Sequence, residues 1–317
     1  MSKNYSSASP AAVKSQKLTV PQIIDYCKDT LGISFELMDE EKAAEFLKKH
    51  NFFFRLKQYC TTCTEQTKSG KYVGLDFGHL VELSTIDMFL RKLLLKMTID
   101  LEHYLKVKLV NDCQNNIADD GYEVVDQFLS KNPKVKDGIL QFTRGCGYNR
   151  TFFDRYLETP SVWNFVEMIG FADFINFYAF YYEYFRQDCE YTKHFESVRR
   201  LRNACAHNSC LLVSFQPVQT FKTDFETNFE LLGGNLGISN GTISNCMKVP
   251  LLNDFAVMLS VYTKLISSPP IKEKTFEEIK EFFDNRMVYR KHYFEDKTDI
   301  KNAYQFARKV LDYYSGK

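Results

Sequence analysis

The apolar pattern between Leu80 and Asn111 constrains the fold more than any other feature of the sequence. Apolar side chains recur there at steps of three and four residues, at Leu83, Ile86, Leu90, Leu93, Met97, Leu101 and Leu105. This period places them on one face of an α-helix. A helix of about 30 residues is about 45 Å long, because each residue adds about 1.5 Å. The pattern therefore predicts a helical bundle assembled along one long helix.

Two charge pairs lie within this segment at a spacing of four residues. Asp87 precedes Arg91, and Glu102 precedes Lys106. An acid placed four residues before a base stabilises an isolated helix by roughly 0.2–0.5 kcal/mol. We therefore expect each pair to support the long helix modestly.

Shorter helical patterns occupy most of the remaining chain. We expect helices at residues 21–32, 39–51, 171–185, 192–207, 250–266, 275–285 and 299–314, with further short ones between 122 and 186. Thr192 is the expected N-cap of its helix. Alternating hydrophobicity, which is typical of strands, is rare. The sequence therefore predicts an all-α fold.

We expect four regions along the chain. Residues 1–16 are polar and predict a disordered tail, followed by an N-terminal helical segment at 17–77. A helical core at 78–268 and a C-terminal helical extension at 269–317 complete the chain. Within the core, residues 214–248 are rich in Gly and Asn and predict an irregular loop region.

The segment Phe52-Phe53-Phe54-Arg55-Leu56-Lys57-Gln58-Tyr59 combines aromatic residues with two cations. One interpretation is a strip that contacts RNA. The other is a connection packed into the core, with Arg55 and Lys57 extending their charged ends to water. The second is the commoner arrangement and is the one we expect.

Composition is that of a soluble globular protein, with 44% hydrophobic and 26% charged residues in 317. The net charge is only +1, so nucleic-acid binding would need a local basic face. The sequence contains neither an apolar run of about 18 residues nor an apolar signal core near its start. We therefore expect a cytoplasmic protein that does not enter the membrane.

Nine scattered cysteines predict free, mostly buried thiols in that compartment. Cys60 and Cys63 form the only Cys-x-x-Cys, and no second pair of ligands follows at a zinc-site spacing. Phosphate-binding glycine motifs are also missing. We therefore expect neither a metal nor another cofactor.

The stretch 192–212 carries the chemistry, because guanidinium, carboxamide and imidazole groups crowd together within an apolar helical pattern. On an ideal helix, Arg200, Asn203 and His207 fall on one face. Arg202 points elsewhere, but its long side chain can still reach the imidazole. The spacing alone leaves the choice between the two arginines open.

These groups suit cleavage of an RNA backbone. A histidine can take the proton from a 2′-hydroxyl or give one to the leaving 5′-oxygen, and an arginine can hold the phosphate bidentately. An asparagine can orient the imidazole or contact phosphate. No metal is required, and a second copy of the cluster could supply the complementary acid or base.

An arginine followed by four to six residues and a histidine is, however, a loose pattern. Roughly 0.7 matches are expected by chance in this composition. The sequence contains three, from Arg200 to His207, from Arg202 to His207 and from Arg286 to His292. By spacing alone, each is better explained as a basic patch at a helix end.

A wider resemblance adds what spacing cannot. Arg202-Asn203-Ala204-Cys205-Ala206-His207-Asn208 is similar to the active-site motif of HEPN-type ribonucleases, in particular the Abi-like abortive-infection proteins of the AbiF and AbiD group. Lys17-Leu18 with Gln22-Ile23, and then the aromatic segment 51–59, resemble that family's N-terminal half, including its Asn-Tyr-x-Arg-Leu signature. The resemblance covers residues 17–267.

The resemblance implies a HEPN-like helical bundle that forms a homodimer in which two motifs face each other. It also implies a metal-independent RNA endonuclease that leaves a 2′,3′-cyclic phosphate and acts as an antiphage toxin. Some relatives are restrained by a structured small non-coding RNA. A non-catalytic HEPN-like RNA-binding or scaffold protein, whose basic helix grips phosphates, is the alternative.

Carried over by position, the catalytic residues are Arg202, Asn203 and His207. Arg202 is preferred to Arg200 because the family motif places Asn directly after its arginine. The expected RNA-binding residues are Lys193, Arg199, Arg200 and Asn208. The chain departs from the family at Cys210 and Leu212, where relatives carry a basic residue and an aromatic one, so substrate contacts on that side are expected to differ.

Overall fold

The computed structural model describes residues 17–145, 150–189, 191–218 and 236–316. Within these ranges the chain forms helices joined by turns and loops, and extended pairing is limited to two isolated bridges. The prediction of an all-α fold is thus confirmed. The expected disordered tail at residues 1–16 lies outside the described residues. None of the described helices combines the length and the hydropathy that a membrane span needs.

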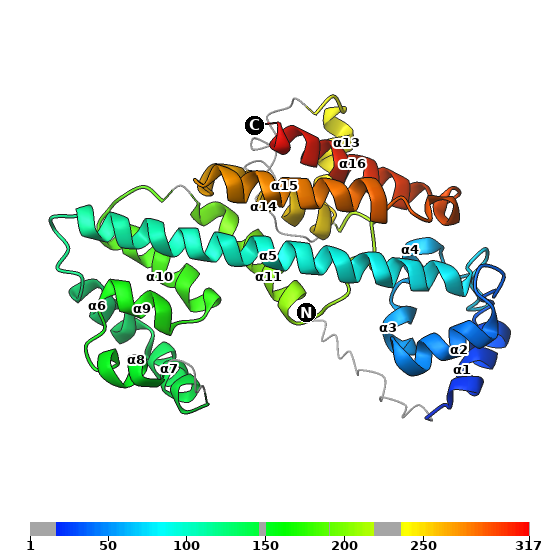
Figure 1. Ribbon diagram of the computed structural model, residues 1–317, viewed down its shortest axis with the longest axis horizontal. Helices are drawn as coiled ribbons and strands as arrows, with labels where there is room; N and C mark the ends of the chain where they lie inside the picture. Colours follow the sequence, from blue (N-terminus) through cyan, green and yellow to red (C-terminus); the bar gives the residue numbers. More distant parts are fainter. Residues whose placement is uncertain (1–16, 146–149, 190, 219–235, 317) are drawn as a thin grey trace, which may run out of the picture.

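The long helix α5, Phe77–Asn115, runs the length of the molecule (Figure 1). Its 39 residues make it about 58 Å long. Asp76 begins the helix by accepting a hydrogen bond from the Gly78 amide at 2.7 Å. The helix predicted from periodicity at 80–111 is confirmed and extends by several residues at both ends.

Other helices pack around α5 in three groups (Figure 1). One end carries α1 (Val20–Asp25), α2 (Glu40–Lys49), α3 (Phe53–Lys57) and α4 (Cys60–Cys63). The opposite end carries α6 (Glu123–Lys131), α7 (Pro133–Gly145), α8 (Arg150–Tyr156), α9 (Val162–Met168) and α10 (Phe171–Tyr184). One face carries α13 (Asn240–Met247), α14 (Pro250–Leu265), α15 (Pro269–Glu281) and α16 (Thr298–Ser315). The helix α11 (Phe195–Ala206) packs between α5 and α14.

The aromatic helix predicted at 171–185 is confirmed as α10, and its rings fill the core at one end of α5. The rings of Phe165 and Phe177 pack edge to face with their centroids 4.8 Å apart, and the centroids of the Phe128 and Phe177 rings are 5.1 Å apart. All three side chains are buried. Edge-to-face pairs add to the stabilisation that burial gives.

Three helix boundaries differ from the sequence predictions. A 3-10 turn, Thr192–His194, precedes α11, because the Thr192 hydroxyl donates to the Cys189 carbonyl instead of capping a helix. The expected irregular region at 214–248 contains α13, which Ser239 caps by accepting from the Thr242 amide, and residues 219–235 lie outside the described ranges. The helix α15 begins at Pro269, since proline fits the first turn of a helix.

The segment 52–59 also differs from the interpretation as a fully packed connection. It folds into α3, which turns Phe53 and Leu56 toward the core. Phe52 and Phe54 are instead exposed to solvent. The expectation that these aromatic side chains are packed away is therefore wrong for two of the three phenylalanines.

A buried ion pair fixes the C-terminal helices to α5. Glu82 on α5 is buried, and both of its carboxylate oxygens accept hydrogen bonds from the Arg286 guanidinium. Arg290 adds a longer contact at 3.7 Å. Arg286, one partner of the third arginine-to-histidine match, is thus occupied by a structural contact.

We expect Arg286→Ala to lower the free energy of unfolding by about 3 kcal/mol, because Glu82 would stay buried with only the distant Arg290 as a partner. Denaturant unfolding measures the loss. Arg308→Ala is the matched control, since Arg308 pairs with half-exposed Asp284 and Asp312 and its loss should cost less than about 1 kcal/mol. Equal losses for the two variants would contradict the anchoring role.

Candidate functional site

The apolar face of helix α11 packs against the rest of the protein, and its polar side chains lie on the other faces. Phe195, Val198, Leu201 and Cys205 are buried at steps of three and four residues. They face α5 and α14, the two helices that α11 contacts most. This packing determines the direction in which each polar side chain of α11 points.

The end of α11 is closed by a tight backbone motif directly after His207. The Asn208 amide donates to the Cys205 carbonyl at 3.1 Å, and the Ser209 amide donates to the Ala204 carbonyl at 2.8 Å. This Schellman arrangement needs a left-handed residue, and Asn208 supplies it with φ of 56°. Asparagine tolerates this conformation better than most residues. His207 is therefore the C-cap residue, directly after the last helical residue Ala206, and its side chain is exposed.

Arg55 on α3 clamps this turn from outside the helix. Its Nη1 donates to the Asn208 carbonyl at 2.6 Å, and its Nη2 lies 3.4 Å from Asn208 Oδ1. Asn208, predicted to bind RNA, thus serves first as the helix cap and as the partner of Arg55. The clamp joins the N-terminal aromatic segment to the end of the motif helix.

A buried carboxylate holds the backbone that follows. Asp87 on α5 is fully buried, pairs with Arg91 at 2.9 Å and accepts from the Leu211 amide at 3.1 Å. The Tyr59 hydroxyl donates to the same carboxylate. Arg91 in turn donates to the Ser209 carbonyl at 3.2 Å. The sequence predicted only that the Asp87–Arg91 pair supports its own helix. In the structure the pair also fixes the chain beyond His207.

Burial governs the protonation of this cluster. It raises the pKa of Asp87, and the hydrogen bonds from Tyr59 and Leu211 together with the Arg91 charge oppose that rise. Burial also raises the pKa of the Tyr59 hydroxyl, and the neighbouring Asp87 raises it further. The tyrosine therefore keeps its proton and remains a donor to the carboxylate.

The two candidate arginines have different environments. Arg200 forms a bidentate pair with buried Asp254 on α14, with Nη2 to Oδ1 at 2.6 Å and Nε to Oδ2 at 3.1 Å. Ser197 accepts another of its hydrogen bonds at 3.1 Å. Burial raises the pKa of Asp254, and Arg200 opposes that rise. Arg200 thus joins α11 to α14.

Arg202 is half-buried and has no carboxylate within ion-pair distance among the residues that the structure describes. Its guanidinium lies over the Phe171 ring at 5.8 Å, and its Nη1 approaches Asn203 Oδ1 at 3.4 Å. The His207 amide donates to the Asn203 carbonyl at 2.9 Å. Asn203 therefore lies between Arg202 and His207, in contact with the first through its side chain and with the second through its backbone.

The other predicted RNA-binding residues lie farther from His207. Arg199 pairs with Glu196 through contacts of 2.8 to 3.0 Å. Lys193 is exposed in the turn that precedes α11, and the helix separates it from His207 by about 20 Å. The structure therefore groups Arg202, Asn203 and His207 toward one end of the helix and places Lys193 at the other.

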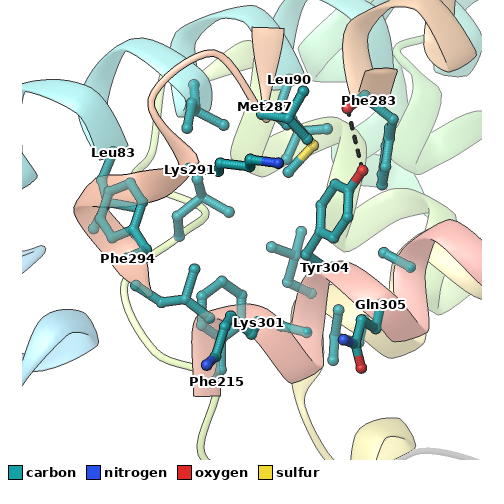
Figure 2. Close-up of a pocket in the computed structure, with 18 of the residues that line it drawn as sticks. Leu83, Leu90, Phe215, Phe283, Met287, Lys291, Phe294, Lys301, Tyr304 and Gln305 are labelled. Carbon is teal, nitrogen blue, oxygen red and sulfur yellow. Dashed lines mark hydrogen bonds between the residues drawn. The ribbon is translucent and has the colours of Figure 1, made fainter. Parts of the chain in front are cut away.

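An apolar cavity of about 400 Å³ lies away from this group, between α5, α14 and α16 (Figure 2). Leu83, Leu90 and Phe283 contribute to its wall, and the Tyr304 hydroxyl donates to the Phe283 carbonyl at 3.3 Å. Leu212 also lines the cavity. Leu212, which departs from the family pattern, is thus a buried residue in the wall of this cavity.

Sequence reasoning missed the residues that position the site, namely Arg55, Tyr59, Asp87 and Arg91. The segment 51–59 was recognised as part of the resemblance, but its contact with the helix end was not predicted. Asp87 and Arg91 were noted only for their spacing. Their common target, the backbone of residues 208–211, is visible only in the fold.

The two arginines should respond differently to truncation. Arg200→Ala should lower the free energy of unfolding by about 3 kcal/mol, because Asp254 would remain buried without its cation. Arg202→Ala should cost less than about 1 kcal/mol, since it loses only a contact with a ring and one long hydrogen bond. Denaturant unfolding of both variants measures the two losses of free energy. A larger loss for Arg202→Ala than for Arg200→Ala would contradict the structural role given to Arg200.

The buried carboxylate gives a second test. Asp87→Ala should lower the free energy of unfolding by roughly 3 kcal/mol and speed hydrogen exchange at the Leu211 amide, because Arg91 and that amide lose their partner. Glu102→Ala removes the other predicted pair of α5, at 3.3 Å from Lys106, and should cost less than about 1 kcal/mol. Unchanged exchange at Leu211 in Asp87→Ala would rule out the anchoring role.

Comparison with known proteins identifies a family for this chain. A search of curated proteins found no match, and neither did a search of solved structures. A family model described as "Abi-like protein" matches residues 45–212. The match covers more than half of the chain and contains the Arg55 clamp, the Asp87 cluster and the whole of α11. The chain therefore belongs to the Abi-like family of abortive-infection proteins.

Proposed function

We propose that this protein is a HEPN-type RNA endonuclease that cleaves without a metal ion and acts as an antiphage toxin. The observation that carries the proposal is the end of α11. There an exposed imidazole follows a half-buried guanidinium that has no carboxylate partner among the described residues. The Arg55 clamp and the Asp87 cluster hold the backbone on the far side of the imidazole. Groups held in this way can act on a phosphodiester without first being ordered.

The proposed reaction is an internal transfer at phosphorus. The 2′-oxygen of one nucleotide attacks the adjacent phosphate, the bond from phosphorus to the 5′-oxygen breaks, and a 2′,3′-cyclic phosphate remains. His207 takes the proton from the 2′-hydroxyl or gives one to the 5′-oxygen, and Arg202 offsets the charge that builds on the phosphate. Asn203 orients these two groups.

One imidazole can fill only one of the two proton-transfer roles at a time. A second copy of the chain, with its α11 end facing the first, would supply the other. We therefore propose a homodimer as the active form. We further propose that the protein acts in the cytoplasm and that a structured small non-coding RNA restrains it, because the family resemblance implies such a partner.

The alternative, a non-catalytic RNA-binding or scaffold protein, draws less support from the geometry. It needs the basic helix face to grip phosphates, but Arg199 pairs with Glu196 and Arg200 pairs with Asp254. Both cations are already neutralised by carboxylates. Arg202, which lies next to Asn203, has no carboxylate partner among the described residues.

We expect His207→Ala to reduce RNA cleavage by at least about 100-fold, since general acid–base catalysis contributes at least that factor. Incubation with single-stranded RNA and analysis of the product ends measures it. The wild-type product should carry a 2′,3′-cyclic phosphate, and EDTA should not change the rate. His292→Ala is the matched control, because His292 is also exposed but lies outside the motif.

Growth of host cells and the RNA that purifies with each variant complete the test. Wild-type protein freed of bound RNA should arrest growth, and His207→Ala should not. Cleavage that persists in His207→Ala would refute the assigned mechanism. Absence of cleavage together with salt-sensitive RNA binding in both proteins would favour the non-catalytic alternative.

A further inference from the structure

Two aromatic side chains at the start of α3 are exposed, and this helix contacts the turn that follows His207 through Arg55. The side chain of Phe54 is 75% exposed and that of Phe52 is 60% exposed. Their neighbours Phe53 and Leu56 point into the core, so the exposure is not a consequence of a loosely packed helix. Leaving two phenylalanines in water is unfavourable, which suggests that something covers them during function.

The stretch of chain that carries these rings is basic. Residues 48–57 contain Lys48, Lys49, His50, Arg55 and Lys57 and no carboxylate. Lys49 pairs with Glu45, and Lys57 lies over the Tyr26 ring at 5.6 Å. Lys48 is exposed and has no ion-pair partner among the described residues. Cations interleaved with exposed aromatic rings match the alternating phosphates and bases of a single-stranded nucleic acid.

A direct contact joins this stretch to the candidate site. Arg55, which follows Phe54 in the chain, donates to the Asn208 carbonyl at 2.6 Å. Asn208 is the residue after His207. Phe54 and His207 are thus the chain neighbours of two residues, Arg55 and Asn208, that are in direct contact.

We propose that Phe52 and Phe54 form a stacking subsite for an unpaired RNA base, and that Lys48 holds an adjoining phosphate. This inference rests on the proposed function and specifies its substrate class as unpaired RNA. Bases in a duplex are stacked on each other and cannot present a face to these rings. The subsite therefore selects single strands and sets the position of the strand relative to His207.

The test measures RNA binding in a His207→Ala background, so that cleavage cannot intervene. The probe is a single-stranded oligoribonucleotide that contains 2-aminopurine, whose fluorescence falls when the base stacks on a ring. Phe54→Ala should weaken binding by about 5- to 140-fold and remove the quenching, because stacking on one aromatic ring contributes about 1–3 kcal/mol. Phe54→Trp should retain both. Binding of a duplex of the same sequence should not respond to either change.

Matched controls exist elsewhere on the surface. Tyr289→Ala removes a ring that is 72% exposed but lies in the C-terminal extension, and it should leave RNA binding unchanged. Lys48→Ala should weaken binding and reduce its dependence on salt, whereas exposed Lys274→Ala on α15 should not. Circular dichroism confirms that each variant is folded.

Other outcomes separate this inference from the proposed function. Binding and quenching that are unchanged in Phe54→Ala would overturn the subsite even if His207-dependent cleavage is established. A shift of Phe54→Ala from dimer to monomer, with RNA binding retained by the monomer, would also overturn it and assign the rings to the contact between copies. Loss of quenching in Phe54→Ala together with cleavage that does not need His207 would support the subsite and reject the mechanism.

Discussion

The buried carboxylate of Asp87 is the interaction on which the geometry of the site depends. An ionised carboxylate is costly to bury unless its oxygens are fully hydrogen-bonded and its charge is paired. Tyr59, Arg91 and the Leu211 amide meet that requirement from three separate segments of the chain. Separating these segments would leave a buried polar or charged group without its partner, and the free-energy cost of doing so keeps the segments together. The position of the chain beyond His207 follows from this cluster.

The three arginines of α11 have different roles because each has a different partner in the fold. Arg199 binds a carboxylate on its own helix, and Arg200 binds one on α14. Arg202 rests against the Phe171 ring and keeps its charge unpaired among the described residues. The helical wheel grouped Arg200 with Asn203 and His207. In the structure, Arg200 pairs with Asp254 and so joins α11 to α14.

The C-terminal helices cover α5 on one face, whereas the end of α11 emerges on another (Figure 1). The Glu82–Arg286 pair anchors this cover, and the apolar cavity lies beneath it. The family match ends at Leu212, before α13 to α16 begin. The family match therefore includes the part of the chain that carries the candidate site. The C-terminal helices stabilise its long axis from outside the matched region.

The sequence by itself determined the helical class, the long axis and the location of the polar cluster. Apolar periodicity and capping are local properties, so they identified α5 and α10 and the end of α11 near His207 within a few residues. Only the tertiary structure decided which arginine lacks a carboxylate partner among the described residues, which phenylalanines are exposed and why Asp87 is buried. Those outcomes depend on partners that are distant in sequence, such as Asp254 for Arg200 and Leu211 for Asp87. Periodicity contains no information about such partners, because it records which face of a helix is apolar and not what that face meets.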